Sequence, residues 1–168
     1  MRIGFDLDRT LIPAPGSVMQ LEPLGWAPRM ISREPLRAGT PKLLLELRQR
    51  RHEIWLYTSS LQSAARLRLW FRAFGVRIDG IINQTRHDAV LLGSKLGCSK
   101  YPPAFGIELL VDDSEGVATE GKRLGFAVLR IEEDDVGWCS RVVCRVAEAE
   151  QTLTRAGGQH LLFALGRC

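Results

Sequence analysis

Cysteine and histidine are scarce in this sequence, and their spacing argues against two common kinds of site. Four cysteines are spread over 168 residues without a C-x-x-C pair, so a disulfide scaffold is not expected. The three histidines show neither H-x-x-x-H nor H-E-x-x-H spacing. We therefore interpret the cysteines as reduced thiols and expect no zinc site.

Long apolar runs are absent as well. No stretch of the sequence is long enough to cross a bilayer, and Asp6, Asp8 and Arg9 interrupt the amino-terminal segment that a secretory signal would keep apolar. The sequence therefore predicts a cytoplasmic protein with no membrane partner. Because 45% of the residues are hydrophobic and 25% are charged, we expect one globular domain over residues 1–168.

The sequence also lacks a strong charge of either sign, since its net charge is only +4. Arginines cluster at residues 48–51 and 66–72, on expected helices, which is typical of solvated helix faces. No RNP, zinc-finger or helix-turn-helix pattern accompanies them, so nucleic-acid binding is not the first expectation. An attraction to anionic partners stays open.

What the sequence does contain is a regular alternation of short apolar runs and amphipathic segments. The first apolar run lies within residues 1–7, and further strands are predicted at 53–57, 77–82, 107–111 and 126–131. Helices are predicted at 40–51, 61–74, 115–124 and from 138 to a break at Gly157, followed by a tail to residue 168. This alternation predicts an α/β fold, a three-layer Rossmann-like sandwich around a five-stranded, mostly parallel sheet.

One segment, residues 12–39, does not fit the alternation. It holds five prolines, which makes it too irregular for a long helix, yet it is too apolar for a linker. We predict an ordered flap over the strand ends, in which Met19 and Leu21 belong to one arm of a hairpin and Trp26 and Met30 pack behind it.

Polar side chains follow three of the five predicted strands. Asp6 and Asp8 follow the first strand, Thr58 the second, and Asp112 and Asp113 the fourth. In an open α/β sheet, ligands bind outside the carboxyl ends of the strands. Two neighbouring carboxylates repel each other unless a cation lies between them. The pattern therefore predicts a site for a cation and a phosphate, although Asp112 and Asp113 are also compatible with a helix N-cap.

Four elements in this order resemble the haloacid dehalogenase-like phosphohydrolase superfamily. They are the segments FDLDRTL and EIWLYTSS, a lysine between the second and fourth elements, and the segment ELLVDDS. The resemblance extends to about Ile131. It implies a Rossmann-like sheet and a Mg²⁺-dependent phosphatase that acts through an aspartyl-phosphate.

The resemblance also implies a role for each matching residue. Asp6 would be the nucleophile and Asp8 the general acid and base, whose main-chain carbonyl faces the metal. Thr58 would bind a phosphoryl oxygen, helped by the amide of Ser59 at a helix start, and Thr10 would contact the substrate. The Mg²⁺ ligands would be Asp6, Asp8 and Asp113, with Asp112 as the alternative to Asp113.

Two positions leave alternatives open. The active-site lysine is Lys100, which precedes Tyr101, Pro102 and Pro103, or else Lys95. Arg9 stands where this family often has glycine, so its side chain either meets an anionic substrate or pairs with an acid.

The sequence has no room for the cap domain that many members of this family carry. In such a family an uncovered site is usual where the substrate is a macromolecule or where another subunit closes the site. We expect a large or anionic phosphorylated substrate such as a phosphoprotein, a nucleotide or an oligonucleotide end. A phosphotransferase and a non-catalytic module that binds a phosphorylated ligand are the alternatives. The oligomeric state stays open.

Overall fold

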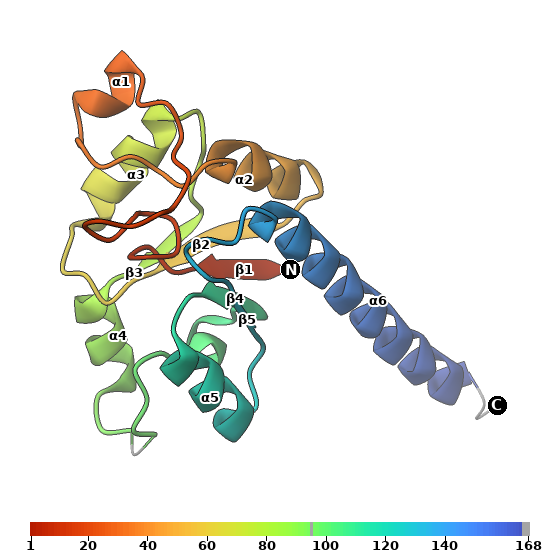
Figure 1. The fold of residues 1–168 in the computed structure, drawn as a ribbon. Helices are drawn as coiled ribbons and strands as arrows, with labels where there is room; N and C mark the ends of the chain where they lie inside the picture. Colours follow the sequence, from red (N-terminus) through yellow and green to blue (C-terminus); the bar gives the residue numbers. More distant parts are fainter. Residues whose placement is uncertain (95, 166–168) are drawn as a thin grey trace.

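The computed structural model describes residues 1–94 and 96–165, and side chains as far as Thr152. Five parallel strands form one sheet in the order β3-β2-β1-β4-β5, which confirms the predicted α/β fold (Figure 1). The strands are β1 Arg2–Phe5, β2 Glu53–Tyr57, β3 Gly80–Ile82, β4 Leu109–Asp112 and β5 Val128–Arg130. The helices are α1 Trp26–Arg29, α2 Thr40–Gln49, α3 Ala64–Ala73, α4 Gln84–Leu91, the 3₁₀ helix η1 Pro102–Phe105, α5 Glu115–Leu124 and α6 Trp138–Leu165.

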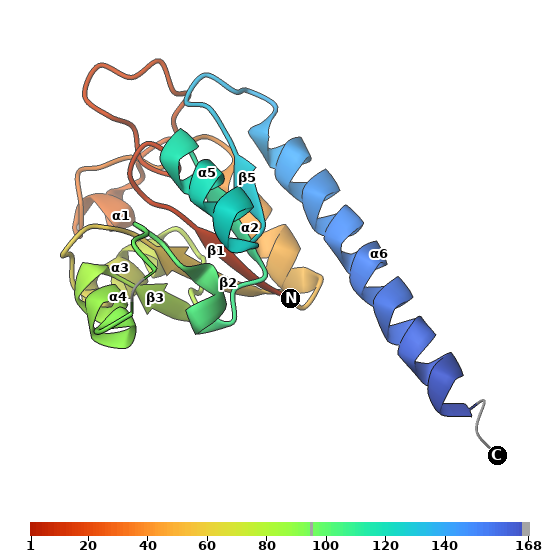
Figure 2. The same cartoon turned by 90° about the horizontal axis from the view of Figure 1, so that it is seen from below.

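The central strand β1 is buried on both faces of the sheet. Ile3 and Phe5 point to one face, where the main core also receives side chains of α2, α3 and α6. A second, smaller core on the opposite face contains Leu110 and Val117. Gly4 lets β1 pack closely against this second core, because a Cβ at Gly4 would lie 3.1 Å from the side chain of Ile107. Helices therefore cover both faces of the sheet, as a three-layer sandwich requires (Figures 1 and 2).

The last helix, α6, is longer than the sequence predicted. A break was expected at Gly157, but one helix runs from Trp138 to Leu165, and its second half extends away from the sheet (Figure 2). Glycine inside a helix costs only about 1 kcal/mol relative to alanine, so it weakens a helix without ending it. The final part of the predicted tail, residues 166–168, lies outside the described residues. No described helix has the length and apolar character needed to cross a membrane.

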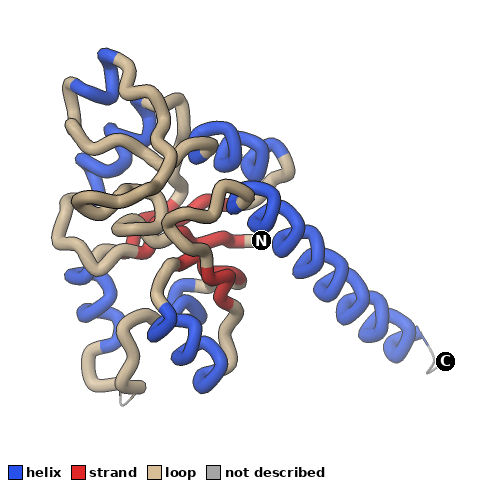
Figure 3. Tube along the Cα trace, in the orientation of Figure 1, coloured by secondary structure: helices blue, strands red, loops and turns tan. Residues whose placement is uncertain are grey.

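The predicted flap, residues 12–39, is mostly loop and contains one short antiparallel bridge (Figure 3). Leu21 pairs with Arg37, and Met19 is buried as expected. The expectation that Trp26 and Met30 pack behind this pairing is wrong, because they are 83% and 81% exposed. They lie on and just after α1, a single helical turn whose one buried residue is proline. One turn is too short to turn several apolar side chains toward the body.

Candidate active site

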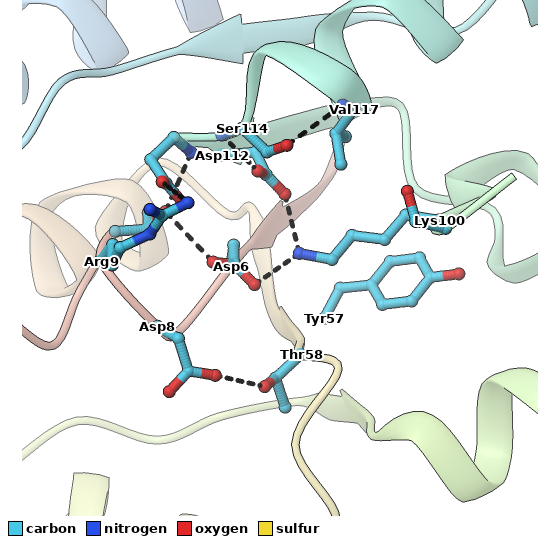
Figure 4. Close-up of polar contacts among 12 residues, drawn as sticks. Asp6, Asp8, Arg9, Tyr57, Thr58, Lys100, Asp112, Ser114 and Val117 are labelled. Atoms are coloured by element: carbon cyan, nitrogen blue, oxygen red, sulfur yellow. Dashed lines mark hydrogen bonds and ion pairs between the residues drawn. The ribbon is translucent and has the colours of Figure 1, made fainter. Parts of the chain in front are cut away.

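The predicted site residues meet where the strand order reverses. β1 pairs with β2 on one side and with β4 on the other, so the carboxyl ends of these three strands are neighbours. Asp6 and Asp8 follow β1, Thr58 follows β2, and Asp112 is the last residue of β4. Figure 4 shows their side chains around one crevice. This is the position at which open α/β sheets bind ligands.

Lys100 joins two of the aspartates. Its Nζ donates a hydrogen bond to Asp6 Oδ1 and another, 2.7 Å long, to Asp112 Oδ2 (Figure 4). The three side chains are buried. Of the two predicted lysines, the structure therefore brings Lys100 to the crevice, whereas Lys95 lies outside the described residues.

Thr10 connects Asp6 to Asp113. Its Oγ1 lies 3.2 Å from Asp6 Oδ2 and 3.2 Å from Asp113 Oδ1, and it accepts a hydrogen bond of 3.1 Å from the Asp113 amide. A hydroxyl has one proton, so it donates to one of the two carboxylates at a time. In this structure Thr10 contacts the acids of the site.

The aspartates at the end of β4 do not cap the following helix. Ser114 is the N-cap of α5, and its Oγ accepts a hydrogen bond of 3.3 Å from the amide of Val117. The Ser114 amide donates to Asp112 Oδ1 at 2.9 Å. The N-cap interpretation of Asp112 and Asp113 is therefore wrong, and both carboxylates face the crevice.

Asp8 and Thr58 form a separate pair at the mouth of the crevice. Thr58 Oγ1 donates to Asp8 Oδ2 at 3.2 Å, and Asp8 is exposed (Figure 4). Thr58 Oγ1 also accepts a hydrogen bond of 3.0 Å from the amide of Ser60. Two oxygen atoms that the sequence assigned to substrate chemistry thus lie beside each other, one on the exposed Asp8 and one on the buried Thr58.

The expectation that Ser59 begins a helix is wrong. Helix α3 begins at Ala64, and Ser63 is its N-cap, accepting a hydrogen bond from the amide of Arg66. The side chains of Thr58 and Ser60 each accept a hydrogen bond from a backbone amide two residues further along the chain. These local bonds hold the segment in a non-helical turn. Ser59 is exposed, and its amide is not part of a helix N-terminus.

The balance of burial and neighbouring charges raises the pKa values of Asp6, Lys100 and Asp113. Burial raises the pKa of Asp6 to about 7, although Lys100 acts to lower it and Asp112 adds to the rise. Burial alone lowers the pKa of Lys100, but the two carboxylates outweigh that effect and raise it. Burial also raises the pKa of Asp113, against the opposing charge of Arg9. Lys100 is therefore a fixed positive charge, and Asp6 needs further positive charge to be fully ionised at neutral pH.

The donor set fits a hard cation such as Mg²⁺. Asp6, Asp112 and Asp113 each offer a carboxylate oxygen, and these oxygens all lie within 4.8 Å of one another. The three acids contact one lysine and one arginine, so the cluster has one negative charge in excess when all are ionised. Carboxylate oxygens are ligands that Mg²⁺ prefers. Among the described residues, the carboxylate of Asp8 does not belong to this group.

Two residues that the sequence analysis missed support the site. The Tyr57 ring lies 5.8 Å from Lys100 Nζ, and its hydroxyl accepts a hydrogen bond of 2.9 Å from the amide of Tyr101. Arg37 is buried, and its guanidinium donates to the carbonyls of Thr10, at 3.4 Å, and Glu132, at 2.6 Å. The apolar position of Tyr57 at the end of β2 marked it as core, and nothing in the sequence distinguished Arg37 from the other arginines.

Comparisons with known proteins found no matching family model and no matching curated protein. Among solved structures, a chain of the "Structure of Pnkp1/Rnl/Hen1 complex" matches 80% of this chain with 16% identity and a TM-score of 0.49. A chain of the "Structure of the Pnkp1/Rnl/Hen1 RNA repair complex" matches 80% with 15% identity and a TM-score of 0.46. The match covers 46% and 43% of those chains, so this chain spans less than half of their length.

Proposed function

We propose that this chain is a Mg²⁺-dependent phosphatase of the haloacid dehalogenase-like type that uses Asp6 as its nucleophile. The observation that carries the proposal is the convergence of Asp6, Asp112 and Asp113 with Lys100 at the point where the strand order reverses. Asp6, Asp113 and the main-chain carbonyl of Asp8 would hold the metal, with Asp112 beside them. A bound Mg²⁺ supplies positive charge that keeps carboxylates ionised and offsets the charge of a phosphoryl group.

In this proposal the reaction has two steps. An oxygen of Asp6 bonds to phosphorus while the bond to the leaving oxygen breaks, and Asp8 gives that oxygen its proton. Asp8 then takes a proton from water, whose oxygen attacks phosphorus and releases phosphate, so that Asp6 is free again. Lys100 balances negative charge next to Asp6 throughout, and the buried Thr58 offers its hydroxyl beside Asp8.

Asp6→Asn tests the nucleophile because it keeps the shape of the side chain and removes its charge. With Mg²⁺ present, turnover of an aryl phosphate should fall about a thousandfold or more. Asp134→Asn, which removes an exposed charge outside the crevice, should keep the wild-type rate. Activity retained in Asp6→Asn would contradict the assignment. A wild type that is inactive on a broad panel of phosphates would favour the non-catalytic binding module, and transfer to an added alcohol would favour a phosphotransferase.

We further propose that the substrate is large, or anionic beyond its phosphate. The two residues at the mouth, Asp8 and Arg9, are exposed, so the described part of the chain leaves this side of the crevice open to solvent. Charges at such a mouth are screened over about 8 Å at physiological ionic strength. A screen of sugar phosphates, nucleotides, phosphopeptides and phosphorylated oligonucleotides at two salt concentrations should therefore show KM rising with salt. A strong, salt-insensitive preference for one sugar phosphate would contradict this proposal.

A further inference from the structure

Arg9 is held in an unusual backbone conformation directly between two site residues. It lies between Asp8 and Thr10 with φ at 61°, in the left-handed region that favours glycine. A side chain in this region costs about 1 kcal/mol relative to glycine. This position is therefore suited to glycine, and the chain instead places a guanidinium there.

The guanidinium of Arg9 reaches one particular carboxylate. Its Nη2 atom lies 3.0 Å from Asp113 Oδ2, while 57% of the arginine side chain remains exposed. In contrast, Asp6 and Asp112 are paired with the buried ammonium of Lys100. Of the three converging acids, Asp113 is thus the one whose charged partner comes from a solvent-exposed side chain.

An ion pair whose arginine is exposed, as here beside a carboxylate that is 13% exposed, is partly screened by water and can exchange. Such pairs contribute little because water screens them and long side chains lose freedom when they form. A divalent cation carries twice the charge of a guanidinium and binds carboxylates directly. The contact between Arg9 and Asp113 is therefore the one that a metal at the acidic cluster would replace most readily.

We infer that Arg9 is an exchangeable cation, which pairs with Asp113 when no metal is bound and turns to an anionic group of the substrate when a metal takes its place. The inference rests on the proposed metal-dependent function. Because the backbone of Arg9 is fixed between Asp8 and Thr10, the released guanidinium stays at the mouth of the crevice. Arg9 is then a positioning residue for the phosphorylated ligand and a competitor of the metal.

Two binding measurements on the full chain test this exchange. Calorimetric titration with Mg²⁺ should show about two- to fivefold tighter binding to Arg9→Gln than to wild type, because the competing ion pair is gone. At saturating Mg²⁺, inorganic phosphate should bind about two- to fivefold more weakly to the same variant. A variant with a damaged structure would bind both Mg²⁺ and phosphate more weakly. Tighter Mg²⁺ binding together with weaker phosphate binding therefore identifies the exchange.

Arg130→Gln is the matched control, because Arg130 donates to the main-chain carbonyl of Asp113, at 3.2 Å, and not to its carboxylate. It should leave Mg²⁺ affinity near the wild-type value. If Arg9→Gln binds Mg²⁺ no more tightly than wild type, or if both variants change equally, the exchange is wrong and the proposed phosphatase is unaffected. If wild type itself binds no Mg²⁺, both proposals fail.

Discussion

The Tyr57 hydroxyl and His87 Nδ1 are hydrogen-bonded at 2.5 Å inside the protein. The same hydroxyl accepts a hydrogen bond from the amide of Tyr101, the residue after Lys100. Since a phenol has one proton, a neutral His87 that carries its proton on Nε2 completes this chain of hydrogen bonds. The bond therefore links α4 to the segment that carries Lys100.

This relationship predicts a pH-dependent contribution of His87 to stability. Burial lowers the pKa of His87 from 6.5, so below that pH the unfolded chain binds more protons than the folded one. The free energy of unfolding that His87 contributes should be complete above pH 6.5 and fall as the pH drops. Urea unfolding at pH 7.5 and 5.5 should show the advantage of wild type over His87→Gln shrinking at the lower pH. His52, whose pKa burial also lowers, is present in both proteins and cancels. An advantage that is equal at both pH values would contradict the prediction.

Two glycines of α5 should respond to alanine in opposite ways. A Cβ at Gly121 would lie 2.8 Å from the carbonyl oxygen of Phe126 and from Val128, so Gly121→Ala should cost about 1–3 kcal/mol of unfolding free energy. At Gly116 the nearest atom would be the Ser114 hydroxyl at 3.4 Å, so Gly116→Ala should stabilise by about 0.5–1 kcal/mol. Denaturant unfolding measures both. Equal effects would show that the packing between α5 and β5 is looser than described.

The buried Arg37 should contribute strongly to the free energy of unfolding through its hydrogen bonds. Its guanidinium donates to the carbonyls of Glu132 and Asp135, at 2.6 and 2.8 Å. Removing it takes one partner from each oxygen, although the Glu132 carbonyl keeps the amide of Asp135, at 3.2 Å. We expect Arg37→Met to lower the free energy of unfolding by about 2–4 kcal/mol. Arg33→Met, at an exposed arginine of the same segment, should change it by less than about 0.5 kcal/mol. A loss in Arg37→Met no greater than that of the control would mean that water replaces these bonds.

The two aspartates at the end of β4, Asp112 and Asp113, should differ in their effect on metal binding. Lys100 and the Ser114 amide occupy the carboxylate of Asp112, whereas the partners of Asp113 are a threonine hydroxyl and an exposed arginine. Asp113→Asn should therefore weaken Mg²⁺ binding by about tenfold or more, and Asp112→Asn by less. Calorimetric titration measures both, with Asp134→Asn as the control. A larger loss of Mg²⁺ affinity in Asp112→Asn than in Asp113→Asn would mean that Asp112, and not Asp113, is the metal ligand.

The sheet and the meeting of the acids could be predicted because both depend on local signals. Apolar runs mark β1 and β4, and parallel strands have their carboxyl ends at the same edge of a sheet, so Asp6 and Asp112 were expected at one edge. That β1 and β4 are neighbours comes from the structure. The nearby prolines, Pro102 and Pro103, indicated Lys100 as one of two candidates for the lysine of the site. Each of these signals lies within a few residues of the side chain that it concerns.

Other features depend on contacts between distant parts of the chain and leave no local signal. Tyr57 and His87 are 30 residues apart in sequence, and Arg37 and Glu132 are 95 apart. Helix α4 buries only His87, so it shows no apolar stripe from which the helix could be recognised. The start of α3 was missed because three serines, Ser59, Ser60 and Ser63, offer similar N-caps. The hydrogen bonds of the Thr58 and Ser60 side chains to amides two residues further along keep the first part of the segment out of the helix.

The strand order also has a consequence for how the chain is made. β1 is the first of these five strands to be synthesised, yet in the finished sheet it lies in the middle, between β2 and β4. Its second edge stays without a partner until residues 109–111 have left the ribosome. An apolar strand with a free edge is prone to pair with other chains. We therefore expect nascent chains that stop before β4 to need chaperone protection, and full-length chains to lose that need once β4 has joined β1.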